Sequence, residues 1–213
     1  MRSAKAKAWI FGNHSPLNPD LSRISPHDLI VAVDKGLETV HRLQLKPGLI
    51  IGDFDSLSEP GLLEVYSDTP LIRLQPDKNA TDTEHAFEEL SSLGYRKITL
   101  FNDLGGRFDH ALALIRNLEA AHREGIDCRI ETGSQILFML DAETELDYPP
   151  GTLLSLLALS PELKFVSSSG LQYPLDDLLI LNYQTRGISN LITQSPARIL
   201  REKGSALAVI TIL

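Results

Sequence analysis

The chain has 213 residues, 43% of them hydrophobic and 23% charged, with a formal net charge of −8 at pH 7. This composition is that of a globular protein with one or two domains. The acidic balance, without a cluster of Lys or Arg, argues against a nucleic-acid partner, and no run of about 18 apolar residues predicts a membrane span. The single cysteine, Cys128, fits a reducing cytoplasm.

Up to about residue 140, short β-rich runs alternate with helical patterns. The expected strands are 8–12, 29–34, 48–53, 70–74, 97–102, 128–132 and 135–140. Strands that alternate with helices predict an α/β fold, in which helices cover both faces of a parallel sheet. Ligands of such sheets bind beyond the carboxyl ends of the strands.

Two segments between the expected strands have the pattern of helices. The first starts at Thr81, where Glu84 three residues later completes a capping box. The second runs from about Asp109, and a glycine ends each of them. The buried side of the second helix is expected to carry Leu112, Ile115 and Leu118.

The pattern changes after the segment "YPPG", residues 148–151. Short apolar runs separated by turn residues follow, which predicts a small antiparallel β domain. We therefore expect one domain at 1–146 and a second at 147–213. Because the second is small, it is expected to pack against the first domain or against another subunit.

Acidic residues follow the ends of several expected strands. Asp34 follows the second strand, Asp53 and Asp55 follow the third, and Asp82 lies in the first turn of a helix. In a parallel sheet these ends share one edge, so the carboxylates would converge and require a compensating cation. Oxygen ligands of this kind suit Mg²⁺.

Each of these acids also has an ordinary interpretation. Asp34 is equally explained as a turn residue or helix cap, and Asp82 as a favourable charge at a helix N-terminus. The pair Asp53 and Asp55 is harder to explain in this way. In an extended chain both carboxylates share one side, while Phe54 between them points to the other.

The segment "LGGRFDH", residues 104–110, combines a glycine pair with an arginine before a helix. Gly105 and Gly106 allow close approach of the backbone to an anion, and the guanidinium of Arg107 matches a phosphate. The alternative is a structural turn with a surface arginine. Lys78 would contact phosphate or stay solvated, and His85 and His110 are interpreted as ordinary side chains.

Six segments in order resemble the motifs of thiamine pyrophosphokinases. They are "VDKG", "IIGDFDSL", "DKNATDTE", "LGGRFDHALA", "GLQYPL" and "TRGISN", from Asp34 to Asn190. Each is modest alone, but the ordered set is specific. The resemblance implies a Rossmann-like ATP-binding domain, a C-terminal β-sandwich for thiamine binding and dimerisation, and a homodimer. The implied reaction is transfer of pyrophosphate from ATP to the hydroxyl of thiamine.

The resemblance also implies roles for individual residues. The implied catalytic residues are Asp34, Asp53, Asp55, Asp82 and Asp109. The implied Mg²⁺ ligands are Asp53, Asp55 and Asp82. The implied ATP-binding residues are Lys78, Gly105, Gly106 and Arg107. The implied thiamine-binding residues are Asp109, Ser189 and Asn190. The sequence departs from the family at Asn79, where aspartate is usual, at Ala80, and at Lys35, where many members have glycine.

Two other functions are considered. The segment "DFDSL" resembles the opening motif of haloacid-dehalogenase-type phosphatases, in which the first aspartate is a nucleophile. Leu57 occupies the Thr or Val position of that motif, and two expected strands precede it, which argues against this class. The second alternative is a nucleotide- or thiamine-binding module without activity, which Asn79 alone supports.

Overall fold

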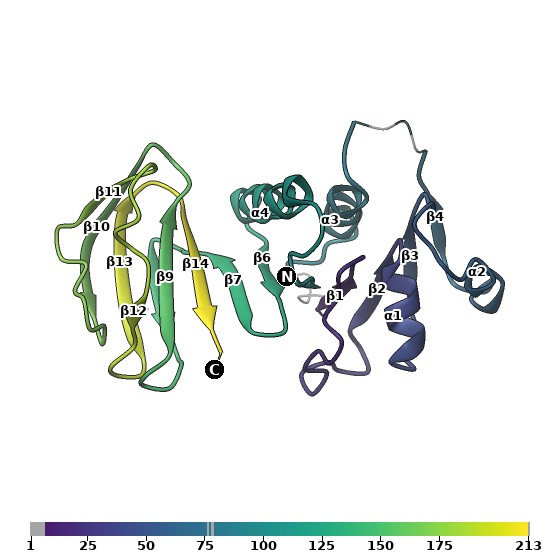
Figure 1. Ribbon diagram of the computed structural model, residues 1–213, viewed down its shortest axis with the longest axis horizontal. Coiled ribbons are helices and arrows are strands. Elements are labelled where there is room, and N and C mark those ends of the chain that lie inside the picture. Colours follow the sequence, from purple (N-terminus) through teal and green to yellow (C-terminus); the bar gives the residue numbers. More distant parts are fainter. Residues whose placement is uncertain (1–6, 76, 78, 213) are drawn as a thin grey trace. The chain divides into compact units, whose positions relative to one another are not determined.

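The computed structural model describes residues 7–75, 77 and 79–212. The chain divides between Gly133 and Ser134 into two compact units, whose helices and strands are labelled in Figure 1. Among the described residues, no helix is both long and apolar enough to cross a membrane.

The first unit is built on a parallel sheet with strand order β6–β5–β1–β2–β3–β4. Its strands are β1 (Ala8–Phe11), β2 (Leu29–Val33), β3 (Leu49–Gly52), β4 (Leu71–Arg73), β5 (Lys97–Phe101) and β6 (Asp127–Glu131). Every neighbouring pair is parallel. The central strands are buried almost throughout, as expected for a sheet covered on both faces. This confirms the α/β prediction.

The strand order reverses at β1. From β1 the chain adds β2, β3 and β4 on one side, whereas β5 and β6 lie on the other side. The loops that follow β1 and β5 therefore leave the sheet in opposite directions. The crevice between such loops is where open α/β sheets bind their ligands.

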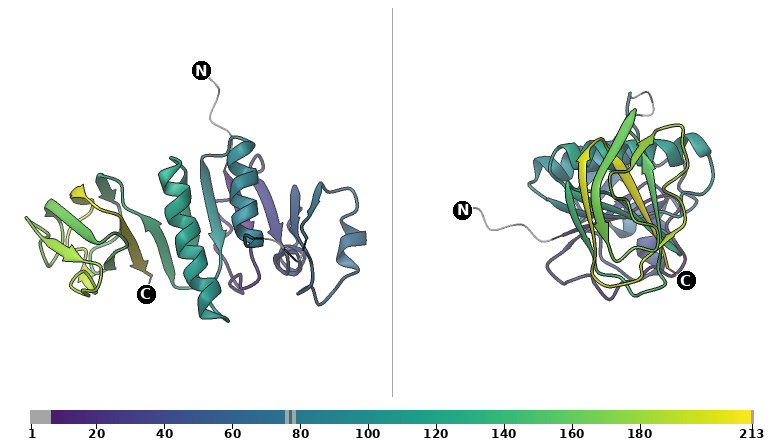
Figure 2. Two further views of the ribbon diagram at one scale, coloured as in Figure 1. Left: turned by 90° about the horizontal axis from the view of Figure 1, so that it is seen from above. Right: turned by 90° about the vertical axis from the view of Figure 1, so that its left-hand side faces the viewer.

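Helices cover both faces of this sheet (Figure 2). They are α1 (Gly36–Arg42), α2 (Leu62–Val65), α3 (Asp82–Ser92) and α4 (Phe108–Arg123). Leu37 of α1 packs in one core with Trp9 and Phe101, whose rings stack at 5.7 Å. α3 and α4 contact each other, α3 also contacts β2 and β3, and α4 contacts β6.

The start of α3 matches the sequence prediction. Thr81 is the N-cap, and its side-chain oxygen accepts a hydrogen bond of 3.2 Å from the backbone N–H of Glu84. Of the three residues expected on the buried side of α4, Leu118 is buried, Ile115 is half-buried and Leu112 is exposed, and Leu114 is buried instead. Leu114, Leu118 and Ala121 follow the helical period of three to four residues.

The second unit consists of two antiparallel sheets, with strand orders β12–β9–β14–β7 and β11–β10–β13–β8. Its strands are β7 (Gln135–Met139), β8 (Glu143–Leu146), β9 (Leu153–Ala158), β10 (Glu162–Ser169), β11 (Leu179–Leu181), β12 (Asn190–Leu191), β13 (Ala197–Lys203) and β14 (Ala206–Thr211). Side chains of both sheets, including Leu156 and Phe165, form a single core. This confirms the predicted antiparallel β region.

The division between the units lies earlier in the chain than residues 146 and 147. β7 and β8 both precede the expected boundary, yet β7 pairs with β14 and β8 pairs with β13. These pairings connect residues that are far apart in the sequence, such as Gln135 with Thr211 and Leu146 with Ala197, and no local sequence pattern reports them. The second unit therefore begins at Ser134.

Candidate functional site

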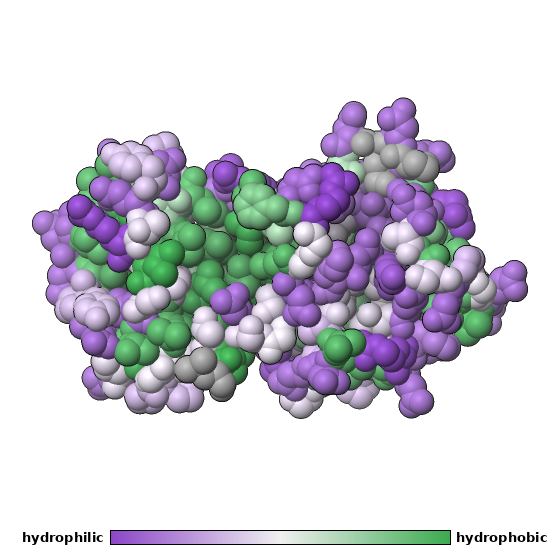
Figure 3. Space-filling view, viewed as in Figure 1, coloured by the Kyte–Doolittle hydropathy of each residue, from purple (hydrophilic) through white to green (hydrophobic). Residues whose placement is uncertain are grey.

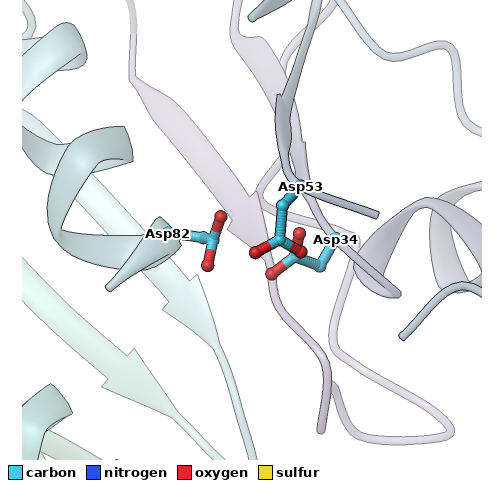
Figure 4. Close-up of side chains that lie close together, drawn as sticks. All are labelled: Asp34, Asp53 and Asp82. Carbon is cyan, nitrogen blue, oxygen red and sulfur yellow. The ribbon is translucent and has the colours of Figure 1, made fainter. Parts of the chain in front are cut away.

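Three carboxylates meet at the carboxyl edge of the parallel sheet. Asp34 follows β2, Asp53 follows β3, and Asp82 is the first residue of α3. Each offers an oxygen, and these oxygens lie within 4.8 Å of one another. Figure 4 shows the carboxylates of Asp34 and Asp53 beside each other, with that of Asp82 facing them. The predicted convergence of acids is thus present for these three residues.

Asp34 is held in a turn that glycine makes possible. Its φ is 48°, its backbone N–H donates to the carbonyl of Ile51 at 3.0 Å, and its Oδ1 accepts from the N–H of Phe54 at 3.4 Å. A Cβ on Gly52 would lie 2.0 Å from this Oδ1. Only glycine at position 52 therefore leaves room for the Asp34 carboxylate.

Asp55 lies outside this cluster. Phe54 has a φ of 67°, so the segment is not extended, and the argument that placed both carboxylates on one side does not hold. Phe54 does turn into the core, but Asp55 is exposed and its N–H donates to Oδ1 of Asp53 at 3.2 Å. The third carboxylate of the cluster is that of Asp34, which the sequence explained equally well as a turn residue.

The donor set of the cluster fits a hard divalent cation. Three carboxylates within 4.8 Å of one another repel unless positive charge lies between them. Their oxygens are the ligand type that Mg²⁺ prefers, and Mg²⁺ typically binds few carboxylates and completes its shell with water and phosphate. The residues present are therefore suited to hold Mg²⁺ together with a polyphosphate.

A cavity of about 240 Å³ adjoins the cluster. Asp34 and Asp82 form part of its wall, and the loops after β1 and β5 form another part. These are the loops that diverge where the strand order reverses. The other polar residues of the wall are Asn13, His14, Thr81, Thr83, Asn102 and His110.

Several of these residues were not identified from the sequence. His110 was interpreted as an ordinary side chain, but it lines the cavity. The available signal was its position directly after Asp109, in the first turn of the helix that follows the glycine pair. Asn13, His14 and Asn102 had no such signal, because they reach the cavity only through the pairing of β1 with β5.

The glycine pair before α4 forms a tight turn. Gly106 has a φ of 78°, which favours glycine, and Gly105 lines the cavity. The turn is fixed by the side chain of Asn102, whose oxygen accepts from the N–H of Leu104 at 2.7 Å. Both glycines are exposed, so their backbone is accessible to a ligand.

Arg107 and Asp109 form a two-point ion pair at the start of α4. The distances are 3.1 Å from Nε to Oδ1 and 2.5 Å from Nη2 to Oδ2. Through this hydrogen bonding, Arg107 lowers the pKa of the Asp109 carboxyl, and Asp109 raises the pKa of Arg107. Both side chains are exposed and neither lines the cavity, so both are accessible to substrates.

Replacing Arg107 with Gln is expected to raise the pKa of Asp109. With Arg107 present, the lowered pKa keeps this carboxylate ionised to a lower pH; without it, protonation begins at a higher pH. The measurement is an NMR titration of the Asp109 side-chain carbonyl in both proteins. An unchanged midpoint in Arg107→Gln would show that the pair does not persist in solution. Stability is expected to stay the same, because the pair is exposed.

The two predicted thiamine-binding residues differ in environment. Ser189 is exposed, has a φ of 60°, and its N–H donates to Oγ of Ser155 at 3.1 Å. Asn190 is buried, and its amide donates to the carbonyl of Tyr173 at 2.7 Å and accepts from the N–H groups of Tyr173 and Leu191. Asn190 therefore holds the backbone of Tyr173. Lys78, the predicted phosphate ligand, lies outside the described residues.

Comparison with known proteins agrees with this geometry. The family described as "Thiamin pyrophosphokinase, catalytic domain" matches residues 22–130, just over half of the chain. A curated relative, the thiamine pyrophosphokinase of Bacillus subtilis (strain 168), is 26% identical over 94% of this chain and 95% of its own.

Solved structures share the fold. The crystal structure of thiamine pyrophosphokinase from Bacillus subtilis has a TM-score of 0.87 at 24% identity and covers 97% of this chain and 99% of its own. That of Geobacillus thermodenitrificans has a TM-score of 0.82 at 24% identity, covering 96% and 97%. Thiamin pyrophosphokinase from Candida albicans has a TM-score of 0.80 at 19% identity, covering 98% and 90%. On the match of the catalytic domain, the chain belongs to the thiamin pyrophosphokinase family.

Proposed function

We propose that this protein transfers pyrophosphate from ATP to the hydroxyl group of thiamine, which yields thiamine diphosphate and AMP. The observation that carries the proposal is the cluster of Asp34, Asp53 and Asp82, beside a cavity where the strand order of the sheet reverses. In a chain of this family, that is the arrangement a metal-dependent phosphoryl-type transfer requires.

Asp34, Asp53 and Asp82 are the residues proposed to hold Mg²⁺. When bound, the ion would neutralise negative charge on the phosphates of ATP. This negative charge is the main electrostatic obstacle to attack by an alcohol. The three carboxylates come from the ends of β2 and β3 and from the start of α3. The packing of these three elements therefore sets the distances between them. This assignment replaces Asp55 by Asp34 in the set expected from sequence.

Phosphate recognition is assigned to the residues around the start of α4. Arg107 presents a fork that already binds a carboxylate at two points, a geometry that also matches phosphate. Gly105 and Gly106 would bring the backbone close to the phosphates, and Lys78 would add a further positive charge. Asp109 beside Arg107 would then face the cationic thiazolium of thiamine.

Thiamine binding is also assigned to Ser189, which is exposed. Asn190 is proposed to act by positioning, since its amide is already bonded to Tyr173 and Leu191. We also propose that the first unit has a Rossmann-like fold and the second unit a β-sandwich fold. The reaction is proposed to take place in the cytoplasm.

A homodimer formed through the second unit is part of the proposal. Tyr183 and Ile188, close to Ser189 in sequence, are 78% and 46% exposed, and Leu157 on β9 is 36% exposed. Figure 3 shows hydrophobic residues gathered over β9 and β14 of this unit. Apolar surface of this kind is typical of interfaces between protein chains. Light scattering of the purified protein would give the mass of two chains if this is correct.

Product analysis by chromatography distinguishes the proposed function from its alternatives. With Mg²⁺ and ATP, AMP is expected to form only when thiamine is added. A phosphatase would instead release inorganic phosphate from phosphoesters without AMP. A binding module would bind ATP or thiamine without turnover. Either of these two results would overturn the proposal.

Asp55→Asn tests whether this exposed carboxylate takes part in the reaction. We expect the variant to fold normally and to lose most of its activity, because Asp55 lies two residues from Asp53 and would contact the metal–nucleotide complex once it is bound. Steady-state kinetics with varied Mg²⁺ are the measurement. Unchanged turnover would limit the acidic site to Asp34, Asp53 and Asp82.

A further inference from the structure

The loop after β1 is firmly fixed to the end of β5. Oγ of Ser15 donates to the carbonyl of Gly12 at 2.8 Å and to that of Phe101 at 3.0 Å. The carbonyl of His14 accepts from the N–H of Asp103 at 2.7 Å. Hydrogen bonds within the loop and to the end of β5 therefore hold the backbone at His14 in place.

The same loop also reaches the turn that carries Asp34. Oδ1 of Asn13 accepts from the backbone N–H of Lys35 at 3.0 Å. Asn13 and His14 together thus connect the acidic turn after β2 with the glycine segment after β5. Both residues line the cavity.

The imidazole of His14 lies against the glycine pair. A Cβ on Gly106 would lie 2.6 Å from Nε2 and 2.9 Å from Cε1 of His14, and a Cβ on Gly105 would lie 3.9 Å from Nδ1. The ring therefore occupies the space that a side chain at position 106 would fill. It presents its nitrogens beside the backbone to which the proposed function assigns the phosphates of ATP.

From this geometry we propose that His14 is a nucleotide-binding residue, whose imidazole N–H donates to a phosphate oxygen of ATP. The inference rests on the proposed function. The imidazole of His14 is exposed at the cavity wall and lies beside Gly106, while its backbone is held by the bond to Asp103. A donor on a fixed backbone loses little conformational entropy on binding, which favours affinity. No local motif marks this residue, since it belongs to the loop of β1.

The test compares binding of three ligands to His14→Ala by calorimetry in the presence of Mg²⁺. The ligands are α,β-methylene-ATP, which is not cleaved at the reacting bond, adenosine, which lacks phosphate, and thiamine. Loss of one hydrogen bond to a charged oxygen is expected to weaken binding of the ATP analogue by about tenfold or more. Binding of adenosine and thiamine is expected to change by no more than about twofold, because neither ligand carries a phosphate for His14 to contact.

His27→Ala is the matched control. His27 is an exposed histidine that precedes β2, at the opposite end of the strands from the cavity, and it is not part of the cavity wall. It should bind all three ligands like the wild type. His14→Gln, which retains an N–H donor, should recover part of the affinity for the ATP analogue. If His14 had only a structural role, His14→Ala would bind all three ligands more weakly, and His14→Gln would not recover the lost affinity.

Failure of this inference and failure of the proposed function give different results. The inference is overturned if His14→Ala binds the ATP analogue as tightly as the wild type, or if adenosine binding falls in parallel. The proposed function fails if the wild type forms no thiamine diphosphate from ATP and thiamine. Calorimetry measures nucleotide binding directly, so the result for His14→Ala can be interpreted whether or not the wild type forms thiamine diphosphate.

Discussion

Asp82→Asn is expected to lower turnover by roughly 10²–10³-fold, the cost of removing one preorganised electrostatic contact at a reacting centre. Asp82 begins α3, and its carboxylate faces those of Asp34 and Asp53. An amide keeps one oxygen but removes the negative charge that would retain Mg²⁺. The measurement is the rate of AMP formation at saturating ATP and thiamine over a range of Mg²⁺ concentrations.

The same substitution is expected to leave the fold intact. Removing one of three clustered carboxylates relieves repulsion but also removes a favourable charge from the first turn of α3, so the thermal midpoint without Mg²⁺ should change little. In the wild type, Mg²⁺ should raise this midpoint, and the rise should be smaller in Asp82→Asn. Asp68→Asn is a suitable control, because Asp68 is exposed and lies outside the cluster. Activity of Asp82→Asn within tenfold of the control would contradict the metal site.

Gly36→Ala is expected to lower the free energy of unfolding by about 3 kcal/mol, at the upper end for overpacking. A Cβ at this position would lie 1.8 Å from the carbonyl oxygen of Phe11 and 2.5 Å from its carbon. These are backbone atoms of β1, a buried central strand, so the conflict is relieved only by moving α1 or the strand. Urea denaturation of both proteins gives the difference directly.

The chain offers a matched control for this prediction. Gly61 precedes α2 with helical φ and ψ of −61° and −16°, and a Cβ there would meet no atom within 4 Å. Gly61→Ala should therefore be neutral or more stable by about 0.5 kcal/mol, because alanine restricts the unfolded chain. Equal stability of Gly36→Ala and Gly61→Ala would show that α1 does not pack against β1 in this way. Since α1 follows Asp34 and Lys35, Gly36→Ala should also reduce activity.

Much of the fold was predictable from the sequence. Strands of four or five buried residues and the capping box at Thr81 are local patterns, and the structure has them where they were expected. α1 was not predicted, because it is a short helix without a side-chain cap. Its stability comes from Leu37 and Val40, which pack into the core beside β1.

The acidic site was predictable only in part. The position of Asp53 and Asp82 at the ends of elements was enough to predict that they converge. Asp34 was expected at the same edge and joins them, whereas Asp55 does not, because the φ of 67° at Phe54 means that the segment is not extended. His14 and Asn102 line the same cavity because β1 pairs with β5, and no local pattern in the sequence reports that pairing.

The most direct test of the central claim is a ³¹P NMR time course of the wild-type protein with ATP, thiamine and Mg²⁺. Our account predicts that the signals of thiamine diphosphate and AMP grow in equal amounts as those of ATP decline, and that neither product forms without thiamine or Mg²⁺. Release of inorganic phosphate without AMP, or ATP signals that stay constant throughout, would contradict it.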